Sequence, residues 1–434
     1  MFEIRSKYLI ILISALLILF SNCKKNENNS IPTIKLISPA QNSTFNVLDT
    51  IRIIADVSDN SQLKSINISI INENLIPVTS PLFIQPKSNT YKIDLDYVID
   101  NIHLSSGKYY ILIIATNANN SKKEFINIFL SEIEKQFESL IVITNTGNNQ
   151  LKINKIDNDF KLQELFTIEG DYSASIINSF YRQLFISGRN ITNLNVLNID
   201  DGQLDWSLEP IIYQPMHDFD CMFLHDNILY LAFSHEYING YNHSGTIKFT
   251  AQSQNTFLPT NPIRFGEYIA ANLKSKTSGN GSIVAYYNIS GSERHSFTAF
   301  NNVSRIFPLD DYSIISFEEA NGSNLIRTYN FEDIYSNTNF TLPYGKINSI
   351  AQIDENNFLI AYQNSIYSYN YNSNSSNLYI DNISANQILY EKLNSRMFIT
   401  ESNKINIYDY SSATFIKELQ ISQNILGINL LYNK

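Results

Sequence analysis

The residues that could do chemistry in this sequence are six histidines, two cysteines and scattered carboxylates. The densest group is "MHDFDCMFLHD", residues 216–226, which holds His217, Asp218, Cys221 and His225. Successive residues of a strand point to opposite faces, so His217 and Asp218 would diverge. A zinc site needs three or four ligands that converge on one point. This pattern therefore predicts no metal site.

Other chemistries lack their motifs, since the sequence has no G-x-S-x-G, no H-E-x-x-H and no glycine-rich phosphate loop. His235 and His243 could meet across a hairpin, but a polar loop is the simpler interpretation. Cys221 lies in the apolar run "DCMFL", which indicates a buried, unreactive thiol. Asp171 and Asp218 could serve glycoside hydrolysis if the fold brought them together. We therefore expect no enzyme and no cofactor, with a polysaccharide-degrading enzyme as the alternative.

Composition and charge indicate a β-rich protein that does not bind nucleic acid. The 434 residues carry 41 acidic against 31 basic side chains, a net charge of −10, which opposes contact with a phosphate backbone. After residue 30, apolar runs are short, rich in β-branched and aromatic residues, and separated by Asn, Asp, Gly and Ser. These features predict strands and turns, and the length predicts more than one domain.

A short apolar segment recurs at intervals of about 40 residues, the length of a four-stranded propeller blade. The segments begin at residues 140, 184, 229, 269, 314, 359 and 398. Polar turns rich in Asp and Asn precede them, and these residues suit tight hairpins because they tolerate a left-handed backbone. The repeats predict a β-propeller over residues 139–434.

The two ends of this region complement each other. Residues 139–168 supply three strands with no inner strand before them, and "NILGINLLYNK", residues 424–434, supplies one inner strand with no partner after it. Joining them completes a seventh blade and removes the exposed sheet edges of an open array. We therefore expect a seven-bladed β-propeller closed by the C-terminal strand. Six or eight blades are the alternatives, because the repeat over residues 253–300 is irregular.

Two outer turns resemble those of known propeller families. "IYDYSSATFIKEL", residues 407–419, resembles the D-x-x-T/S-G-x-x-I turn of YVTN and WD repeats. "NIDDGQLDW", which ends at Trp206, resembles a quinoprotein blade. The resemblance implies a fold and no particular activity, because propellers host many functions. One such blade does not imply a pyrroloquinoline cofactor.

The segments that lead into the inner strands of a propeller converge at one end of its central channel. Aromatic and charged side chains gathered there would suit a polar ligand or a loop of a partner protein. A water-filled channel bordered by ordinary loop residues is the alternative. The candidate ligand-binding residues of this mouth are Asp171, Tyr172, His217, Asp218, Arg264, Arg305, Tyr344 and Lys346.

Residues 33–132 read as an Ig-like β-sandwich, with short alternating strands and turn signals every 8–12 residues. "IKLISPAQNSTF", "IIADVSDNSQLKSINISI" and "GKYYILIIATNANN" resemble successive motifs of bacterial Ig-like modules, which act as spacers and adhesion elements. Asn117 stands where those modules often have an aspartate, so the resemblance implies no calcium site here. Residues 133–138 are the predicted linker.

The chain begins with Arg5 and Lys7 and an apolar run over residues 8–20. A membrane-spanning helix needs about 20 apolar residues, so the run predicts a secretory signal. "LFSNC" resembles the lipobox of bacterial lipoproteins of the Bacteroidetes type. This resemblance implies that residues 1–22 are removed, that Cys23 carries the lipid and that residues 23–32 form a polar tether.

The combined expectation is a lipid-anchored protein of the outer membrane, facing the periplasm or the cell surface. Its propeller would act, without catalysis, as a binding or scaffold module for an envelope protein partner or a glycan. Its other partner would be the membrane itself, through the lipid on Cys23.

Overall fold

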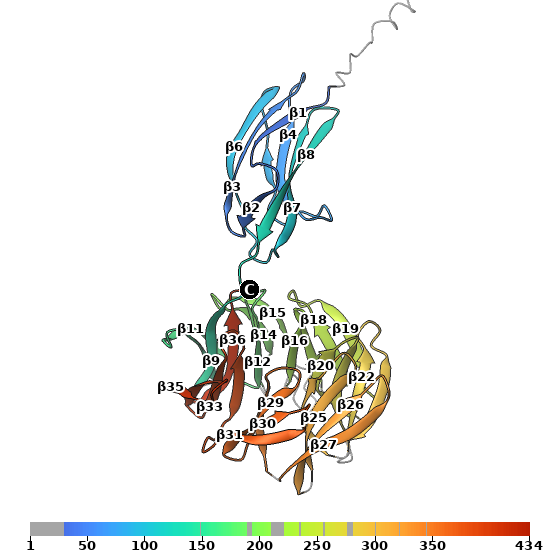
Figure 1. Ribbon diagram of the computed structural model, residues 1–434, viewed down its shortest axis with the longest axis vertical. Coiled ribbons are helices and arrows are strands. Elements are labelled where there is room, and N and C mark those ends of the chain that lie inside the picture. The colour runs from blue at the N-terminus through green and yellow to red at the C-terminus, as the bar shows by residue number, and fades with distance from the viewer. Residues whose placement is uncertain are drawn as a thin grey trace, which may run out of the picture. The chain divides into compact units, whose positions relative to one another are not determined.

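The computed structural model describes residues 30–147, 149–188, 193–209, 221–233, 236–254, 257–275, 281–299, 301–320, 322–343 and 345–434. The chain divides into two compact units between Glu134 and Lys135 (Figure 1). All the regular elements among the described residues are β-strands, which confirms the all-β expectation there. None of these residues forms a helix long and apolar enough to cross a membrane.

The first unit is a sandwich of a three-stranded and a five-stranded sheet. The three-stranded sheet has the order β1 (Thr33–Ser38), β3 (Thr50–Ser58), β6 (Thr90–Val98). The five-stranded sheet has the order β2 (Ser43–Asn46), β8 (Ser121–Ser131), β7 (Gly107–Thr116), β4 (Ser65–Ile71), β5 (Leu82–Ile84). The alternation of the sequence makes this core, because Ile51 and Ile53 of β3 and Ile111 and Ile113 of β7 are all fully buried.

The second unit contains seven four-stranded antiparallel sheets in its described residues. The first is β11 (Leu162–Glu169), β10 (Gln150–Ile156), β9 (Phe137–Gly147), β36 (Ile425–Tyr432). The next three are β12 (Ala174–Asn178), β13 (Gln183–Ser187), β14 (Leu194–Asn198), β15 (Leu204–Leu208); β16 (Met222–His225), β17 (Ile228–Ala232), β18 (Tyr237–Tyr241), β19 (Ile247–Gln252); and β20 (Phe257–Phe265), β21 (Tyr268–Ser275), β22 (Gly281–Tyr287), β23 (Glu293–Ala299). The last three are β24 (Asn302–Pro308), β25 (Ser313–Ala320), β26 (Ser323–Asn330), β27 (Tyr335–Pro343); β28 (Ile347–Gln352), β29 (Asn357–Tyr362), β30 (Ser365–Asn370), β31 (Ser375–Ile380); and β32 (Gln387–Glu391), β33 (Arg396–Glu401), β34 (Lys404–Asp409), β35 (Phe415–Gln420).

The recurring apolar segments of the sequence lie in the second strand of each sheet, counted from the inner edge. They occupy β9, β13, β17, β21, β25, β29 and β33. Nearly every residue of these strands is buried, because neighbouring sheets pack on both of their faces. The outermost strands, such as β35, are mostly exposed. The unit is therefore a propeller-like array of radial sheets.

The inner strands contact one another across neighbouring sheets. Each inner strand contacts the inner strand of the next sheet. In order, these strands are β36, β12, β16, β20, β24, β28 and β32, and β32 in turn contacts β36. Strand β36 reaches its sheet from the far end of the sequence and pairs with β9, for example through Leu430 opposite Leu140. Apolar side chains fill the space between sheets, as where Phe137 of β9 lies 5.9 Å from Phe398 of β33, measured between ring centroids.

Arg182, which directly precedes β13, links the sheet of β12–β15 to the sheet that contains β9 and β36. Its Nη1 lies 2.6 Å from Glu138 Oε2 on β9 and donates to the carbonyl oxygen of Tyr432 on β36, at 3.2 Å. Its Nε donates to Asp200 Oδ2 at 3.0 Å. The hydrogen bond from Arg182 holds the pKa of Asp200 below its ordinary value, against the opposing effect of partial burial. One guanidinium therefore fixes the first and last strands of the unit to the next sheet.

Replacing Arg182 with Ala should lower the free energy of unfolding of the second unit by about 1–3 kcal/mol, because two carboxylates lose a partly buried partner. Trp206, the chain's only tryptophan, lies in β15 and reports this transition by fluorescence during urea denaturation. The control is Lys161→Ala, whose pair with Asp159 is three-quarters exposed on both sides, at 75% and 76%, and should contribute little. Equal midpoints for wild type and Arg182→Ala would contradict the prediction.

Candidate functional site

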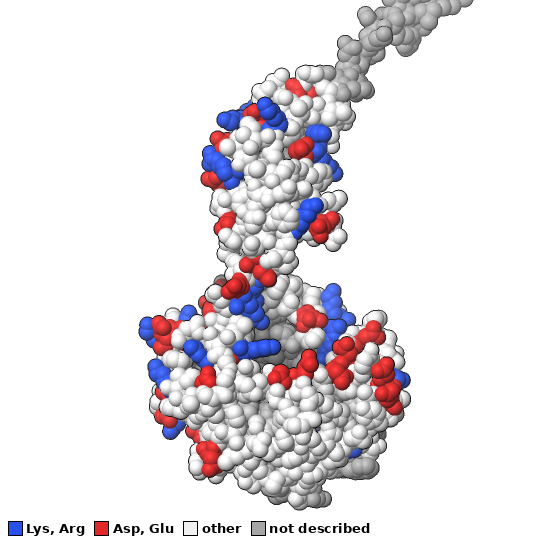
Figure 2. Space-filling view, in the orientation of Figure 1, with Lys and Arg blue, Asp and Glu red and all other residues white. Residues whose placement is uncertain are grey.

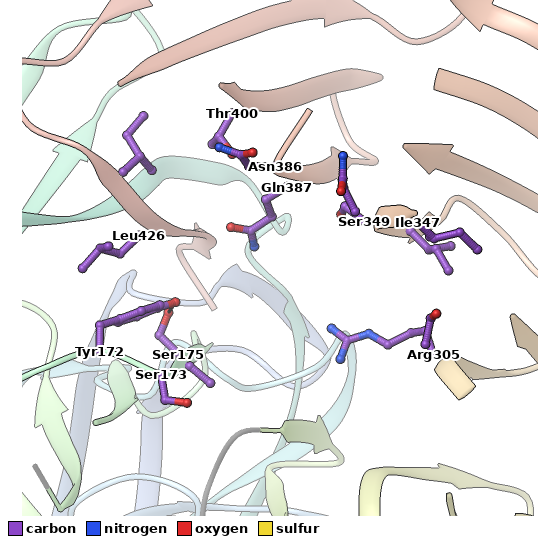
Figure 3. A pocket seen from close by; sticks show the side chains of 15 residues that line it. Tyr172, Ser173, Ser175, Arg305, Ile347, Ser349, Asn386, Gln387, Thr400 and Leu426 are labelled. Atoms are coloured by element: carbon purple, nitrogen blue, oxygen red, sulfur yellow. Dashed lines mark hydrogen bonds between the residues drawn. The ribbon is translucent and has the colours of Figure 1, made fainter. Parts of the chain in front are cut away.

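A cavity of about 400 Å³ opens where five inner strands begin, at the starts of β12, β24, β28, β32 and β36 (Figure 3). We call it the entry cavity. Its volume lies within the range of about 300–1,000 Å³ that is usual for ligand sites. The hollow that Figure 2 shows in the second unit is bordered by acidic and basic side chains, unlike the entry cavity, whose described lining holds one charged residue. The lining residues are Tyr172, Ser173, Ala174, Ser175, Ser304, Arg305, Ile347, Asn348, Ser349, Ile350, Asn386, Gln387, Thr400, Ile425 and Leu426.

Side chains, not ladder bonds, connect the inner strands around this cavity, because each inner strand pairs only within its own sheet. Gln387 of β32 bonds both backbone groups of Ile428 on β36: its Nε2 donates to the carbonyl oxygen at 3.3 Å, and its Oε1 accepts from the amide at 3.1 Å. Ser349 of β28 accepts from the amide of Ile388 on β32, at 3.1 Å. The wall of the cavity is thus held by its own polar side chains.

Tyr172 is locked against the closing strand. Its hydroxyl shares a 3.0 Å hydrogen bond with Ser175 Oγ, which also accepts from Asn429 Nδ2 of β36 at 2.7 Å. Burial raises the pKa of Tyr172 to about 12, despite the opposing effect of the bond to Ser175. A Cβ atom at Gly427 would overlap the Tyr172 hydroxyl oxygen, so a larger residue there would force the Tyr172 ring to move.

Arg305 is the only charged side chain among the described residues that line the entry cavity. Its Nη1 donates to Asn261 Oδ1 of β20, at 3.3 Å, and the residue is otherwise exposed. In Figure 3 its side chain reaches from β24 toward the side of the cavity that holds Tyr172 and Ser175. The remaining lining is made mainly of hydroxyl and amide groups, with a few aliphatic side chains.

The structure places two of the residues predicted for the mouth, Tyr172 and Arg305, in the lining of the entry cavity. Asp171 and Lys346 precede the lining residues Tyr172 and Ile347 in the chain but do not line the cavity themselves. His217, Asp218 and Tyr344, like the predicted lipid site Cys23, lie outside the described residues.

Arg264 lies at the other end of its strand, contrary to the expectation. It was expected at the entry to an inner strand, but β20 already begins at Phe257 and Arg264 is its penultimate residue. There its Nη1 lies 3.7 Å from Asp226 Oδ2, in the turn after β16. Asp226 lines a second cavity, of about 390 Å³, at the ends of β12, β16 and β36. Arg264 therefore belongs to the opposite end of the inner strands.

Cys221 and His243 make contacts within the protein, and His225 lies 3.3 Å from Asp226, measured from Nε2 to Oδ2. Cys221 is half-buried and donates to Asn261 Oδ1 at 3.1 Å, so the expected burial in an apolar run is wrong. His243 stacks on Tyr181 at 3.9 Å between ring centroids, and its carbonyl oxygen accepts from Trp206. His235 lies outside the described residues. The described residues form no cluster of three or more His, Cys, Asp or Glu side chains that could hold a metal.

A buried carboxylate, Glu318 of β25, was not singled out from the sequence. It is fully buried and accepts hydrogen bonds from Tyr329, Ser316 and Asn301, at 2.6, 2.7 and 2.8 Å. Burial, and then the Glu318 charge, raise the pKa of Tyr329 above its ordinary value. Arg327 lies 3.8 Å away. Because these partners satisfy the carboxylate, its contacts indicate a structural role.

The sequence did not lead to a prediction for most residues of the cavity wall. Asn386, Gln387 and Thr400 come from one repeat and Ser349 from the repeat before it, and each is an ordinary polar residue at or near the end of a strand. The available signal was their position, since residues that begin successive inner strands converge at one end of the channel. The prediction from this position included only charged and aromatic residues, so the residues with hydroxyl and amide side chains were missed.

Comparison with known proteins supports both units. The sequence family described as "Bacterial Ig domain" matches residues 32–113, within the first unit. No curated protein matches the chain. A solved structure from Lactobacillus plantarum is similar at 10% identity, with 69% of this chain and all of that one covered and a TM-score of 0.51.

Two further solved structures are similar at lower scores. One is a quinoprotein alcohol dehydrogenase-like protein from Bacteroides thetaiotaomicron, at 11% identity, with 92% and 97% of the two chains covered and a TM-score of 0.45. The other is the C-terminal WD40 domain of Sif2, at 11% identity, with 67% and 86% covered and a TM-score of 0.43. At these identities the likeness concerns the fold alone.

Replacing Gly427 with Ala should displace the Tyr172 ring and destabilise the second unit by about 1–3 kcal/mol, because the added methyl group overlaps the Tyr172 hydroxyl. The same change in a Tyr172→Ala background should cost much less, since the space is then free. Urea denaturation followed by Trp206 fluorescence measures both costs and their coupling. Equal costs in the two backgrounds would show that Tyr172 does not constrain this position.

Proposed function

We propose that the second unit is a seven-bladed β-propeller that binds a glycan in the entry cavity without cleaving it. The seven four-stranded sheets, the order of the inner-strand contacts and the pairing of β36 with β9 support this blade count and this closure. A closed ring also explains why the first and last strands of the unit share one sheet. The structural likenesses support the fold and leave the activity to the site.

The single observation that carries the binding proposal is the polarity of the entry cavity. Pockets for drug-like ligands are lined mostly by apolar groups. Here hydroxyls and amides dominate, and Asn348 and Asn386 are exposed, with side-chain amides that bond no other residue in the part of the chain that the structure describes. A sugar presents many hydroxyl groups that pair with such side chains as donors and acceptors. A glycan therefore suits this lining better than an apolar loop of an envelope partner.

The described lining residues favour binding over catalysis. Glycoside hydrolysis requires two carboxylates at a defined separation, about 5–9.5 Å. None of the described residues that line the entry cavity is an aspartate or a glutamate. The buried Glu318 already bonds protein groups and does not line the entry cavity. The polysaccharide-degrading enzyme is therefore the weaker alternative.

The proposed location is the cell envelope, with Cys23 as the lipid anchor and the Ig-like unit as a spacer. The match to the bacterial Ig family supports an extracellular or envelope location. The lipid anchor rests on the sequence, through the short apolar run and the cysteine that follows it. With this anchor, the propeller would bind a glycan close to the membrane to which the protein is attached.

A glycan array probed with the purified full-length protein should give specific binding. Changing Asn348 and Asn386 together to Ala should weaken binding to the best ligand about tenfold or more, because two hydrogen bonds are lost. Asn372→Ala is the matched control, since Asn372 is exposed in the turn between β30 and β31, outside the cavity. If no glycan binds, the proposed function is wrong. If the double variant binds as well as wild type, the cavity is not the site.

The lipid anchor has its own test. Expressed in a bacterium that processes lipoproteins, the wild-type chain should incorporate labelled palmitate and sediment with membranes, and Cys23→Ala should do neither. Cys221→Ala is the matched control, because that cysteine lies beside β16 in the second unit. Membrane retention of Cys23→Ala with unchanged labelling would contradict the anchor.

A further inference from the structure

The charge of the entry cavity is opposite to that of the chain. The whole sequence carries a net charge of −10. The described residues that line the cavity carry a single charged group, the guanidinium of Arg305, and no carboxylate. An unpaired cation in a partly enclosed cavity favours an anion, because water shields the two charges less there than on an open surface. We propose that the ligand is an acidic glycan, whose uronate carboxylate binds Arg305.

The guanidinium of Arg305 has room for a bidentate contact. An arginine has five N–H donors, arranged in a fork that matches a carboxylate. Among the described residues, Arg305 makes one hydrogen bond, from Nη1 to Asn261 Oδ1 at 3.3 Å. No acidic side chain in that part of the chain pairs with Arg305, in contrast to Arg182, whose fork is occupied by Glu138 and Asp200. The bond to Asn261 steadies one edge of the guanidinium and leaves the other donors for a ligand.

A β-bulge aims Arg305 at the cavity. In the pairing of β24 with β25, Val303 lies opposite Glu318 and Arg305 lies opposite Phe317, so Ser304 is the extra residue. Bulges turn side chains away from the regular alternation of a strand and occur next to binding sites. Here Ser304 and Arg305 both line the cavity, although neighbours in a regular strand would face opposite ways. The bulge leaves the shielded Ser304 hydroxyl without a hydrogen-bond partner, a local cost that a binding site can explain.

Recognition must come from direct contact with Arg305. At physiological salt, charges separated by more than about 8 Å are largely screened, so the overall negative charge neither steers an acidic glycan in nor repels it strongly. A carboxylate on Arg305, with sugar hydroxyls on Asn348 and Asn386, would use the unoccupied polar groups of the cavity. A neutral sugar would leave the guanidinium without an anionic partner.

This inference rests on the proposed glycan binding, and the test separates the two. The probes are oligogalacturonides, their methyl esters and neutral oligosaccharides of equal length, measured by calorimetry against the full-length protein. We expect the free acids to bind about tenfold or more tightly than the esters, because the esters cannot form the charged contact. Arg305→Gln should abolish this preference, and Arg305→Lys should retain part of it, because lysine keeps the charge but lacks the fork.

Arg264→Gln is the matched control, because Arg264 lies at the other end of its inner strand, beside Asp226. It should leave the preference for acids unchanged. Equal affinity for acids and esters, or an unchanged preference in Arg305→Gln with an unchanged unfolding midpoint, would overturn the inference and leave neutral glycan binding intact. If none of the acidic or neutral probes binds and the array is also blank, glycan binding itself fails, and the inference fails with it.

Discussion

The pairing of β36 with β9 is the constraint on which the second unit depends. These strands lie at opposite ends of the unit's sequence, and they meet in one sheet through a long antiparallel ladder. Without that ladder, β9 would expose an unpaired edge and the contacts of β36 with β12 and β32 would be lost. Arg182 reinforces this junction, because its guanidinium contacts the first strand, the last strand and the neighbouring sheet together.

The same constraint produces the entry cavity. Inner strands of separate sheets cannot share a backbone ladder, so polar side chains such as Gln387 and Ser349 bridge them. Those bridges face the central space and give it a hydrophilic wall. Gly427 of β36 adds a steric condition, since only the missing side chain lets Tyr172 pack against the closing strand. The pairing of β36 with β9 and the polar wall of the cavity are therefore two consequences of one arrangement.

Two charged groups of the second unit, Glu318 and Arg305, differ in how many hydrogen-bond partners the protein supplies. Glu318 is fully buried and bonded on several sides, which fits a structural role inside a blade. Arg305 is exposed in a cavity and bonds one neutral amide oxygen. Because burying an ion without partners is costly, proteins satisfy internal charges and leave unpaired ones where a solvent molecule or a ligand can reach them. This difference makes Arg305, and not Glu318, the functional candidate.

The sequence by itself determined the strands, because their apolar and polar periodicity is local. The recurring segment at residue 229 lies in β17 and that at residue 314 in β25, as the spacing predicts. Tyr172 and Arg305, which the sequence predicts at the mouth, line the entry cavity because both lie at or near the start of an inner strand. Arg264 was misplaced because the start of β20 is set by its pairing with β21, where Phe257 lies opposite Ser275.

Only the tertiary structure decided which polar residues share the cavity. Asn386 and Thr400 have no distinctive local pattern and meet within one sheet, whereas Ser349, Arg305 and Tyr172 reach the same cavity from three other sheets. The bulge at Ser304 is likewise a property of the ladder between β24 and β25. Local periodicity encodes which face of a strand is buried, whereas convergence at a site depends on pairing partners far away in the sequence.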